Sequence, residues 1–191
     1  MIYAIVVAAS WLVFIVYWAA SATRAKRDAT RQSSWQSAVA IRVVVVLAAI
    51  LLVRLPAAQR LLRGSREVLS FSNPTAGTIG ALLSVAGVAV AVWARKCLGT
   101  NWSPRPSVKV GHELVTSGPY RWVRHPIYTG MLLAVLGTAL DTGILGLVIF
   151  LGVCLYLVLR IPVEEGLMLG LFPEQYARYR EQTKALIPHV V

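Results

Sequence analysis

The chain has 191 residues, of which 57% are hydrophobic, and it carries a formal net charge of +11 with a mean hydropathy of +0.66. These values exclude an ordinary soluble domain and are typical of one compact integral membrane bundle. The basic residues gather at the ends of apolar runs, where the positive-inside rule and anionic headgroups explain them, so we expect no nucleic-acid partner. Cys97 and Cys154 match no zinc or redox spacing, and we expect neither a disulfide framework nor a metal site.

Three apolar runs in the first half of the chain each predict a membrane helix. Residues 2–20 are long enough to cross a hydrocarbon core of about 30 Å, and they lack the charged start of a signal peptide, so we expect a retained helix. Residues 39–55 carry Arg42 near one end and Arg54 at the other, where the two side chains can reach opposite interfaces. Residues 75–94 are rich in glycine and alanine, which favours close helix packing.

Basic loops set the expected orientation. Residues 23–32 and 95–124 are both strongly basic, which places them on the cytoplasmic side and the N-terminus outside. The loop between the second and third apolar runs also carries three arginines, and this conflicts with a simple alternation of sides.

The second half of the chain predicts a helical hairpin. Residues 127–140 and 144–159 are apolar and are separated by the turn sequence "DTG", which begins at Asp141. The C-terminal residues that follow are amphipathic and charged, so we expect them to be cytosolic and partly helical. The predicted fold is therefore all-α: a polytopic transmembrane bundle of five membrane helices with a C-terminal hairpin and a cytosolic cofactor pocket. We expect residues 1–94 to form three transmembrane helices and residues 95–191 to form the catalytic region.

Three polar clusters fall on one predicted side of the membrane, at residues 112–120, 124–128 and 160–165. The hairpin brings the second and third clusters to neighbouring helix ends. Polar groups placed among apolar helices are typical of a small-molecule pocket. The sequence has no Gly-rich phosphate loop, no GxSxG nucleophile and no metal-ligand spacing, so no serine or metal mechanism has candidate residues.

Two interpretations of the charged residues stay open on pattern alone. Arg160 and Glu164 are four residues apart and share one helix face, either as an interfacial salt bridge or as groups that bind an anion and a cation. Pro162 lies between them and predicts a kink at the end of the fifth helix. His125 is either an interfacial polar residue before a helix-starting proline or a ligand contact. We expect Arg121 and Arg124 to mark the cytosolic interface and not the chemistry.

At these residues the sequence resembles the isoprenylcysteine carboxyl methyltransferase family. The resemblance rests on "HELVTSGPYRWVRHPIYTG" and, about 30 residues later, "RIPVEEGLMLGLFPEQYARY", and it covers roughly residues 93–188. It implies S-adenosylmethionine as methyl donor, bound at the cytosolic ends of the last two helices. Arg160 then corresponds to the catalytic arginine at the substrate carboxylate, and an upstream contact falls near Arg105. Implied cofactor contacts are His112, Glu113, Leu114, Val115, Tyr120, His125, Pro126, Ile127, Tyr128 and Glu164.

The resemblance also implies an acceptor and a location. Tyr176, Tyr179 and Arg180 lie in the family's C-terminal segment and are expected to contact substrate and close the site. The expected reaction is methylation of the carboxylate of a lipophilic, isoprenylcysteine-type acceptor that enters from the bilayer of a prokaryotic plasma membrane, with the site facing the cytoplasm. The alternatives are methylation of a phospholipid amine or a thiol, and a non-catalytic membrane protein. The oligomeric state is not predicted.

Overall fold

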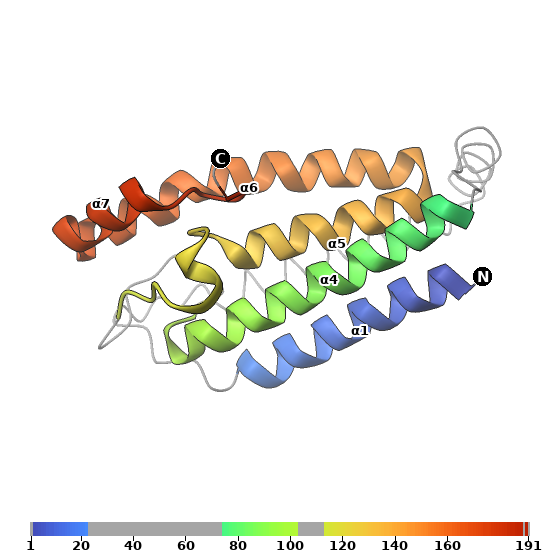
Figure 1. Ribbon diagram of the computed structural model, residues 1–191, viewed down its shortest axis with the longest axis horizontal. Coiled ribbons are helices and arrows are strands. Elements are labelled where there is room, and N and C mark those ends of the chain that lie inside the picture. Colours follow the sequence, from blue (N-terminus) through green and yellow to red (C-terminus); the bar gives the residue numbers. More distant parts are fainter. Residues whose placement is uncertain (1, 23–73, 103–112, 189, 191) are drawn as a thin grey trace, which may run out of the picture.

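The computed structural model describes residues 2–22, 74–102, 113–188 and 190, and these residues form helices, short turns and one isolated bridge (Figure 1). The predicted all-α class is confirmed. The second apolar run, residues 39–55, and the arginine-rich loop after it lie outside the described residues. In chain order the helices are α1 (Ile2–Ala22), α4 (Pro74–Leu98), the 3-10 turns η1 (Gly99–Asn101) and η2 (Gly118–Arg121), α5 (Pro126–Thr142), α6 (Ile144–Leu171) and α7 (Pro173–Gln182).

The protein is an integral membrane protein whose long helices run side by side (Figure 1). Within the described ranges, three segments are long and apolar enough to cross a membrane: Ile2–Ser21, Pro74–Asn101 and Gly146–Leu171. They correspond to α1, α4 and α6. Helix α5 has 17 residues, about 25 Å at 1.5 Å per residue, and packs mainly against α4. Large apolar side chains on α1 and α6 remain exposed, as expected for faces that contact lipid.

Small residues allow α4 and α5 to pack with their backbones close together. A Cβ atom added to Gly130 of α5 would lie 2.5 Å from the carbonyl oxygen of Gly87 and 2.6 Å from the amide nitrogen of Ala91. Backbone atoms at such distances leave no room for a side chain. The glycine and alanine content that predicted close packing of residues 75–94 is therefore used against α5.

Replacing Gly130 with valine is expected to destabilise the bundle by about 1–3 kcal/mol, because the new side chain meets backbone that has no space to move. The measurement is the melting temperature of purified protein in detergent. Gly152→Val is the matched control, since a Cβ atom added to Gly152 of α6 meets nothing within 4 Å. Equal melting temperatures for the two variants would contradict the described α4–α5 contact.

The predicted helical hairpin is confirmed. Helix α5 ends at Thr142, and Gly143 has φ 75°, a left-handed conformation that glycine adopts without strain. Helix α6 then continues to Leu171, with Pro162 inside it. The charged cluster at residues 160–165 is thus part of the long helix and not its end. Because apolar residues resume after Glu165, the helix continues past the proline.

Arg95 joins the ends of α1 and α4. Its Nη1 donates to the carbonyl of Gly99 at 2.7 Å, and its Nη2 donates to the carbonyl of Ser21 at 2.9 Å. The guanidinium carbon lies 4.3 Å from the ring centroid of Trp102, and the residue is only 2% exposed. A cation at two helix C-termini satisfies carbonyls that lack partners within the helices, and it fixes this end of the bundle.

Candidate functional site

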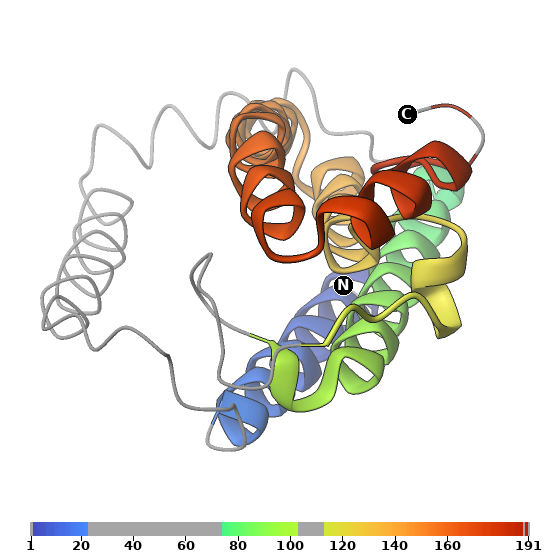
Figure 2. The same cartoon turned by 90° about the vertical axis from the view of Figure 1, so that its left-hand side faces the viewer.

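A cavity of about 320 Å³ lies at the end of the bundle where α5 begins. Figure 2 shows this end, where α7 and the segment before α5 meet. One part of the cavity wall is apolar and includes Leu157 and Met168 of α6, while another part carries charged and phenolic groups. The wall is formed by Trp18, Leu98, Asn101, Trp102, Glu113, Leu114, Val115, Tyr120, Arg124, His125, Ile127, Tyr128, Met131, Tyr156, Leu157, Arg160, Glu164, Leu167, Met168, Leu171, Tyr176 and Tyr179.

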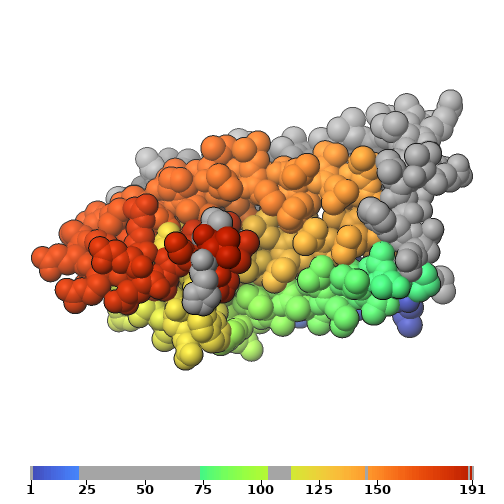
Figure 3. Space-filling model, turned by 45° about the horizontal axis from the view of Figure 1, so that its top comes forward, coloured from blue at the N-terminus to red at the C-terminus, as the bar shows by residue number. Residues whose placement is uncertain are grey.

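The C-terminal segment holds the turn that leads into α5. Val123 and Lys184 form a parallel bridge, the amide of Arg124 donates to the carbonyl of Lys184 at 2.8 Å, and the amide of His125 donates to the carbonyl of Ala185 at 2.9 Å. These bonds satisfy backbone groups that would lack partners before a helix that begins with proline. The space-filling view shows the C-terminal residues packed on this part of the molecule (Figure 3).

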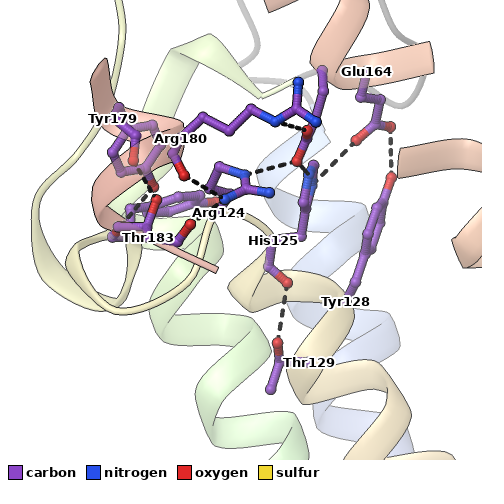
Figure 4. A network of polar contacts seen from close by, with 10 residues as sticks. Arg124, His125, Tyr128, Thr129, Glu164, Tyr179, Arg180 and Thr183 are labelled. Carbon is purple, nitrogen blue, oxygen red and sulfur yellow. Dashed lines mark hydrogen bonds and ion pairs between the residues drawn. The ribbon is translucent and has the colours of Figure 1, made fainter. Parts of the chain in front are cut away.

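Glu164 is surrounded by three polar groups of the cavity. Its Oε1 accepts a hydrogen bond from the Tyr128 hydroxyl at 2.5 Å and from Arg160 Nε at 2.7 Å. Its Oε2 lies 3.8 Å from Nδ1 of His125 (Figure 4). The rings of His125 and Tyr128 stack with centroids 5.5 Å apart. Arg160 and Glu164 therefore share a helix face, as their spacing predicted, and both face the cavity.

Glu165 is the buried centre of a second network, and the sequence interpretation missed it. Arg124 Nε lies 2.7 Å from Oε1, His125 Nε2 lies 3.2 Å from the same oxygen, and Arg180 Nε lies 3.4 Å from Oε2. Arg124 also donates through Nη1 to the carbonyls of Arg180 and Thr183. The expectation that Arg124 only marks the interface was wrong, because its side chain is 10% exposed and lines the cavity.

Three tyrosines close the side of the cavity next to α7. The Tyr179 hydroxyl donates to the carbonyl of Tyr120 at 2.6 Å, and the rings of Tyr176 and Tyr179 lie 5.8 Å apart. Burial raises the pKa of Tyr179 to about 12 and raises the pKa of Tyr120 and Tyr176 as well. These phenols stay protonated at neutral pH, so the Tyr179 hydroxyl remains a donor.

Most predicted site residues lie together on the cavity wall. Pro126 is fully buried and does not line the cavity, and Arg180 is half-exposed and contacts Glu165 instead of the cavity. His112 and Arg105 lie outside the described residues. Tyr156, Trp18 and Trp102 were not predicted to line the site. The predicted site residues that line the cavity are Glu113, Leu114, Val115, Tyr120, His125, Ile127, Tyr128, Arg160, Glu164, Tyr176 and Tyr179.

Comparison with protein families identifies the family of the chain. The model of the family described as phospholipid methyltransferase matches residues 75–175, which run from α4 to the start of α7 and make up more than half of the chain. The chain belongs to the phospholipid methyltransferase family. The resemblance recognised in the sequence is confirmed by individual relatives.

These relatives differ in the acceptor that their names state. Protein-S-isoprenylcysteine O-methyltransferase of Schizosaccharomyces pombe is 35% identical over 79 residues, 40% of this chain and 34% of the relative. The enzyme of that name from Tribolium castaneum is 29% identical over 131 residues, 66% of this chain and 45% of the relative. Methanethiol S-methyltransferase of Mycobacterium tuberculosis is 32% identical over 88 residues, 46% of this chain and 34% of the relative. The chain thus spans between a third and a half of the length of these relatives.

A solved structure shares the fold. It is described as the eukaryotic intramembrane Ras methyltransferase, isoprenylcysteine carboxyl methyltransferase. The two structures superpose with a TM-score of 0.56 and 25% sequence identity, over 71% of this chain and 53% of the other. This chain therefore shares the helical fold of that membrane methyltransferase.

Proposed function

We propose that this protein transfers a methyl group from S-adenosylmethionine to the carboxylate of a lipophilic acceptor of the isoprenylcysteine type. One observation carries the proposal: Arg160 and Glu164 stand side by side on a cavity wall between apolar membrane helices, in a chain of a methyltransferase family. A carboxylate for a cationic donor and a guanidinium for an anionic acceptor are the two charges that this reaction needs.

The cavity residues fit this donor. S-adenosylmethionine supplies a methyl group activated on a positively charged sulfur, and it also carries an aromatic base and an amino-acid end. The cavity presents Glu113 and Glu164 as carboxylates, aromatic rings such as Tyr120 and Tyr128, and apolar side chains. Its volume lies in the range of about 300–1,000 Å³ that small-molecule sites occupy. In the proposal, Glu113, Tyr120, His125, Tyr128 and Glu164 hold the donor.

The acceptor side of the proposal rests on Arg160. A carboxylate is already ionised at neutral pH and needs no general base, so the protein contributes mainly by positioning, which is worth up to about 7–11 kcal/mol of a barrier. Arg160 orients the carboxylate, and Tyr176 and Tyr179 close the site. Tyr156 on α6 lines the cavity and is 55% exposed on the apolar face of the helix, and in the proposal a lipid acceptor enters on this side. Arg180 supports this segment through Glu165.

The proposed location follows from the basic segments. Strongly basic residues flank the cavity end of the bundle in the sequence, which supports a site on the cytoplasmic side of the membrane. In this scheme residues 95–191 supply the charged groups of the catalytic region. Residues 1–94 supply membrane helices, and α1 adds Trp18 as an apolar part of the wall.

A second candidate is methylation of a phospholipid amine or a thiol at the same site. The family description and the name of the Mycobacterium tuberculosis relative favour it. Glu113 on the cavity wall is a carboxylate that can accept the proton that an amine or thiol must lose. The two candidates share the other donor contacts and differ in the acceptor and in the role of Glu113.

The experiment that decides between them incubates purified protein with labelled S-adenosylmethionine and one acceptor at a time, and measures methyl transfer to that acceptor. The panel contains farnesylcysteine analogues, amino-lipids and a short thiol. We expect label in the farnesylcysteine methyl ester. Label only in amino-lipids or the thiol would establish the second candidate, and no binding of S-adenosylmethionine by calorimetry would point to a non-catalytic membrane protein.

Replacing Glu164 with glutamine is expected to weaken S-adenosylmethionine binding by about 10- to 100-fold, because a charge-assisted hydrogen bond is worth about 1.5–3 kcal/mol. His125→Ala is expected to act in the same direction, since its ring stacks on Tyr128 and contacts both glutamates. Calorimetric titration in detergent measures the affinity. Glu174→Gln, an exposed carboxylate on α7, is the control. Unchanged affinity in both site variants would refute the donor site.

A further inference from the structure

Tyr156 lies on α6 where the cavity meets the lipid-facing surface. Its side chain lines the cavity, yet the residue is 55% exposed, and its neighbour Leu155 is 62% exposed. A phenol on an apolar face needs a hydrogen-bond partner, because lipid offers none. Its partner is Arg160, whose Nη1 donates to the Tyr156 hydroxyl at 2.6 Å.

Arg160 is held from both directions along the helix. Tyr156 lies four residues before it and Glu164 four residues after it, so all three side chains share one face of α6. Tyr156 accepts from Nη1, and Glu164 accepts from Nε at 2.7 Å. A planar guanidinium held at two of its nitrogens has little freedom to rotate. The entropy cost of ordering this long side chain is then met in the folded protein and not when an acceptor binds.

The two anchors differ in what else they contact. Glu164 also accepts from Tyr128 and lies near His125, so it belongs to the part of the cavity proposed to hold the donor. Tyr156 contacts Arg160 from the other side, where α6 has an exposed apolar face. The phenol is neutral and does not offset the charge of Arg160, as a second carboxylate would.

We propose that Tyr156 is a positioning residue for the methyl acceptor, which orients Arg160 toward an anionic head group arriving from the bilayer. This inference rests on the proposed function, because it gives Arg160 the role of binding a carboxylate. Removal of the Tyr156 hydroxyl takes away the oxygen that accepts from Arg160 Nη1, while the hydrogen bond from Nε to Glu164 stays. The guanidinium is then less well oriented for the acceptor, while the groups around Glu164 are unchanged.

The test compares Tyr156→Phe with Tyr128→Phe, which removes the phenol hydroxyl on α5 that donates to Glu164. We expect Y156F to raise the KM for a farnesylcysteine acid by about 5- to 10-fold and to leave the S-adenosylmethionine Kd within about twofold. We expect Y128F to weaken S-adenosylmethionine binding instead. Tyr156→Gln, which keeps an oxygen acceptor, is expected to show a smaller increase in KM than Y156F. An unchanged KM in Y156F, or an equal loss of donor affinity in both variants, would overturn the inference.

Equilibrium binding separates this inference from the proposed function. The probes are S-farnesylthioacetic acid and its methyl ester, added to wild-type protein and to Y156F in detergent. We expect wild type to prefer the acid and Y156F to lose most of that preference. If wild type shows no preference for the acid, the carboxylate role of Arg160 fails and the inference fails with it. If wild type prefers the acid and Y156F keeps the full preference, only the role of Tyr156 is wrong.

Discussion

Replacing Arg160 with glutamine is expected to lower methyl transfer to a carboxylate acceptor by at least about 100-fold, a loss typical of a misplaced reacting group. Glutamine keeps most of the side-chain length but removes the charge that would orient the acceptor carboxylate. The affinity for S-adenosylmethionine is expected to stay within about threefold of wild type. Single-turnover rates with saturating donor, together with calorimetric donor titrations, measure the two effects separately.

The contact between Arg160 and Glu164 makes this separation a stringent test. The two side chains meet at 2.7 Å, so loss of the arginine removes a counter-charge from the proposed donor contact. Tyr128 and His125 still hold that carboxylate, and a cationic donor can replace the missing charge. Donor affinity is therefore expected to be largely retained, even though the two residues touch.

Two further variants sharpen the result. Arg160→Lys keeps the charge but loses the planar fork that binds two oxygens, and it is expected to recover only part of the rate. Arg121→Gln removes a cation that lies over Trp122 and outside the cavity, so its rate should match wild type. A large loss of donor affinity in Arg160→Gln with a normal acceptor rate would reverse the roles assigned to the two charges.

Replacing Glu165 with glutamine is expected to destabilise the protein by about 3–5 kcal/mol, because it leaves the buried Arg124 guanidinium without its carboxylate. The same change removes the partner of His125 Nε2, so donor binding should weaken in protein that remains folded. Melting temperatures in detergent and donor titrations at low temperature measure the two losses. The effect should exceed that of any single change on the lipid-facing surface.

Arg180→Gln is the matched control for this network. Arg180 contacts the other oxygen of Glu165 at 3.4 Å with its own side chain 54% exposed, so the pair is worth about 0–1 kcal/mol. A double replacement, Arg124→Met with Glu165→Leu, removes both buried charges and should recover much of the stability without recovering donor binding. Full stability in Glu165→Gln alone would mean that the buried pair does not support the fold.

Local sequence patterns predicted the features that depend on nearby residues. The "DTG" turn predicted the hairpin because Gly143 supplies the left-handed conformation at that point. The four-residue spacing predicted that Arg160 and Glu164 share a face. Both are consequences of helix and turn geometry, which a few adjacent residues determine.

Features that depend on distant partners could not be predicted in the same way. Arg124 donates to the carbonyls of Arg180 and Thr183, which are far along the chain. The sequence gives no sign of these partners, so Arg124 was assigned to the interface. The sequence interpretation did not single out Glu165 beside Glu164, because only the structure shows that the two carboxylates belong to different networks. Pairing of a basic residue with one of two adjacent glutamates requires knowledge of how the helices pack.

The pairing of Lys184 and Ala185 with the turn before α5 has a consequence for the order of assembly. During synthesis, residues 123–125 emerge before the hairpin and long before the backbone groups that they pair with. Both helices of the hairpin are synthesised before the turn acquires its partners. The cavity therefore matures last, and its formation reports that α5, α6 and α7 have reached their final places. Donor binding during translation would serve as a readout of completed insertion.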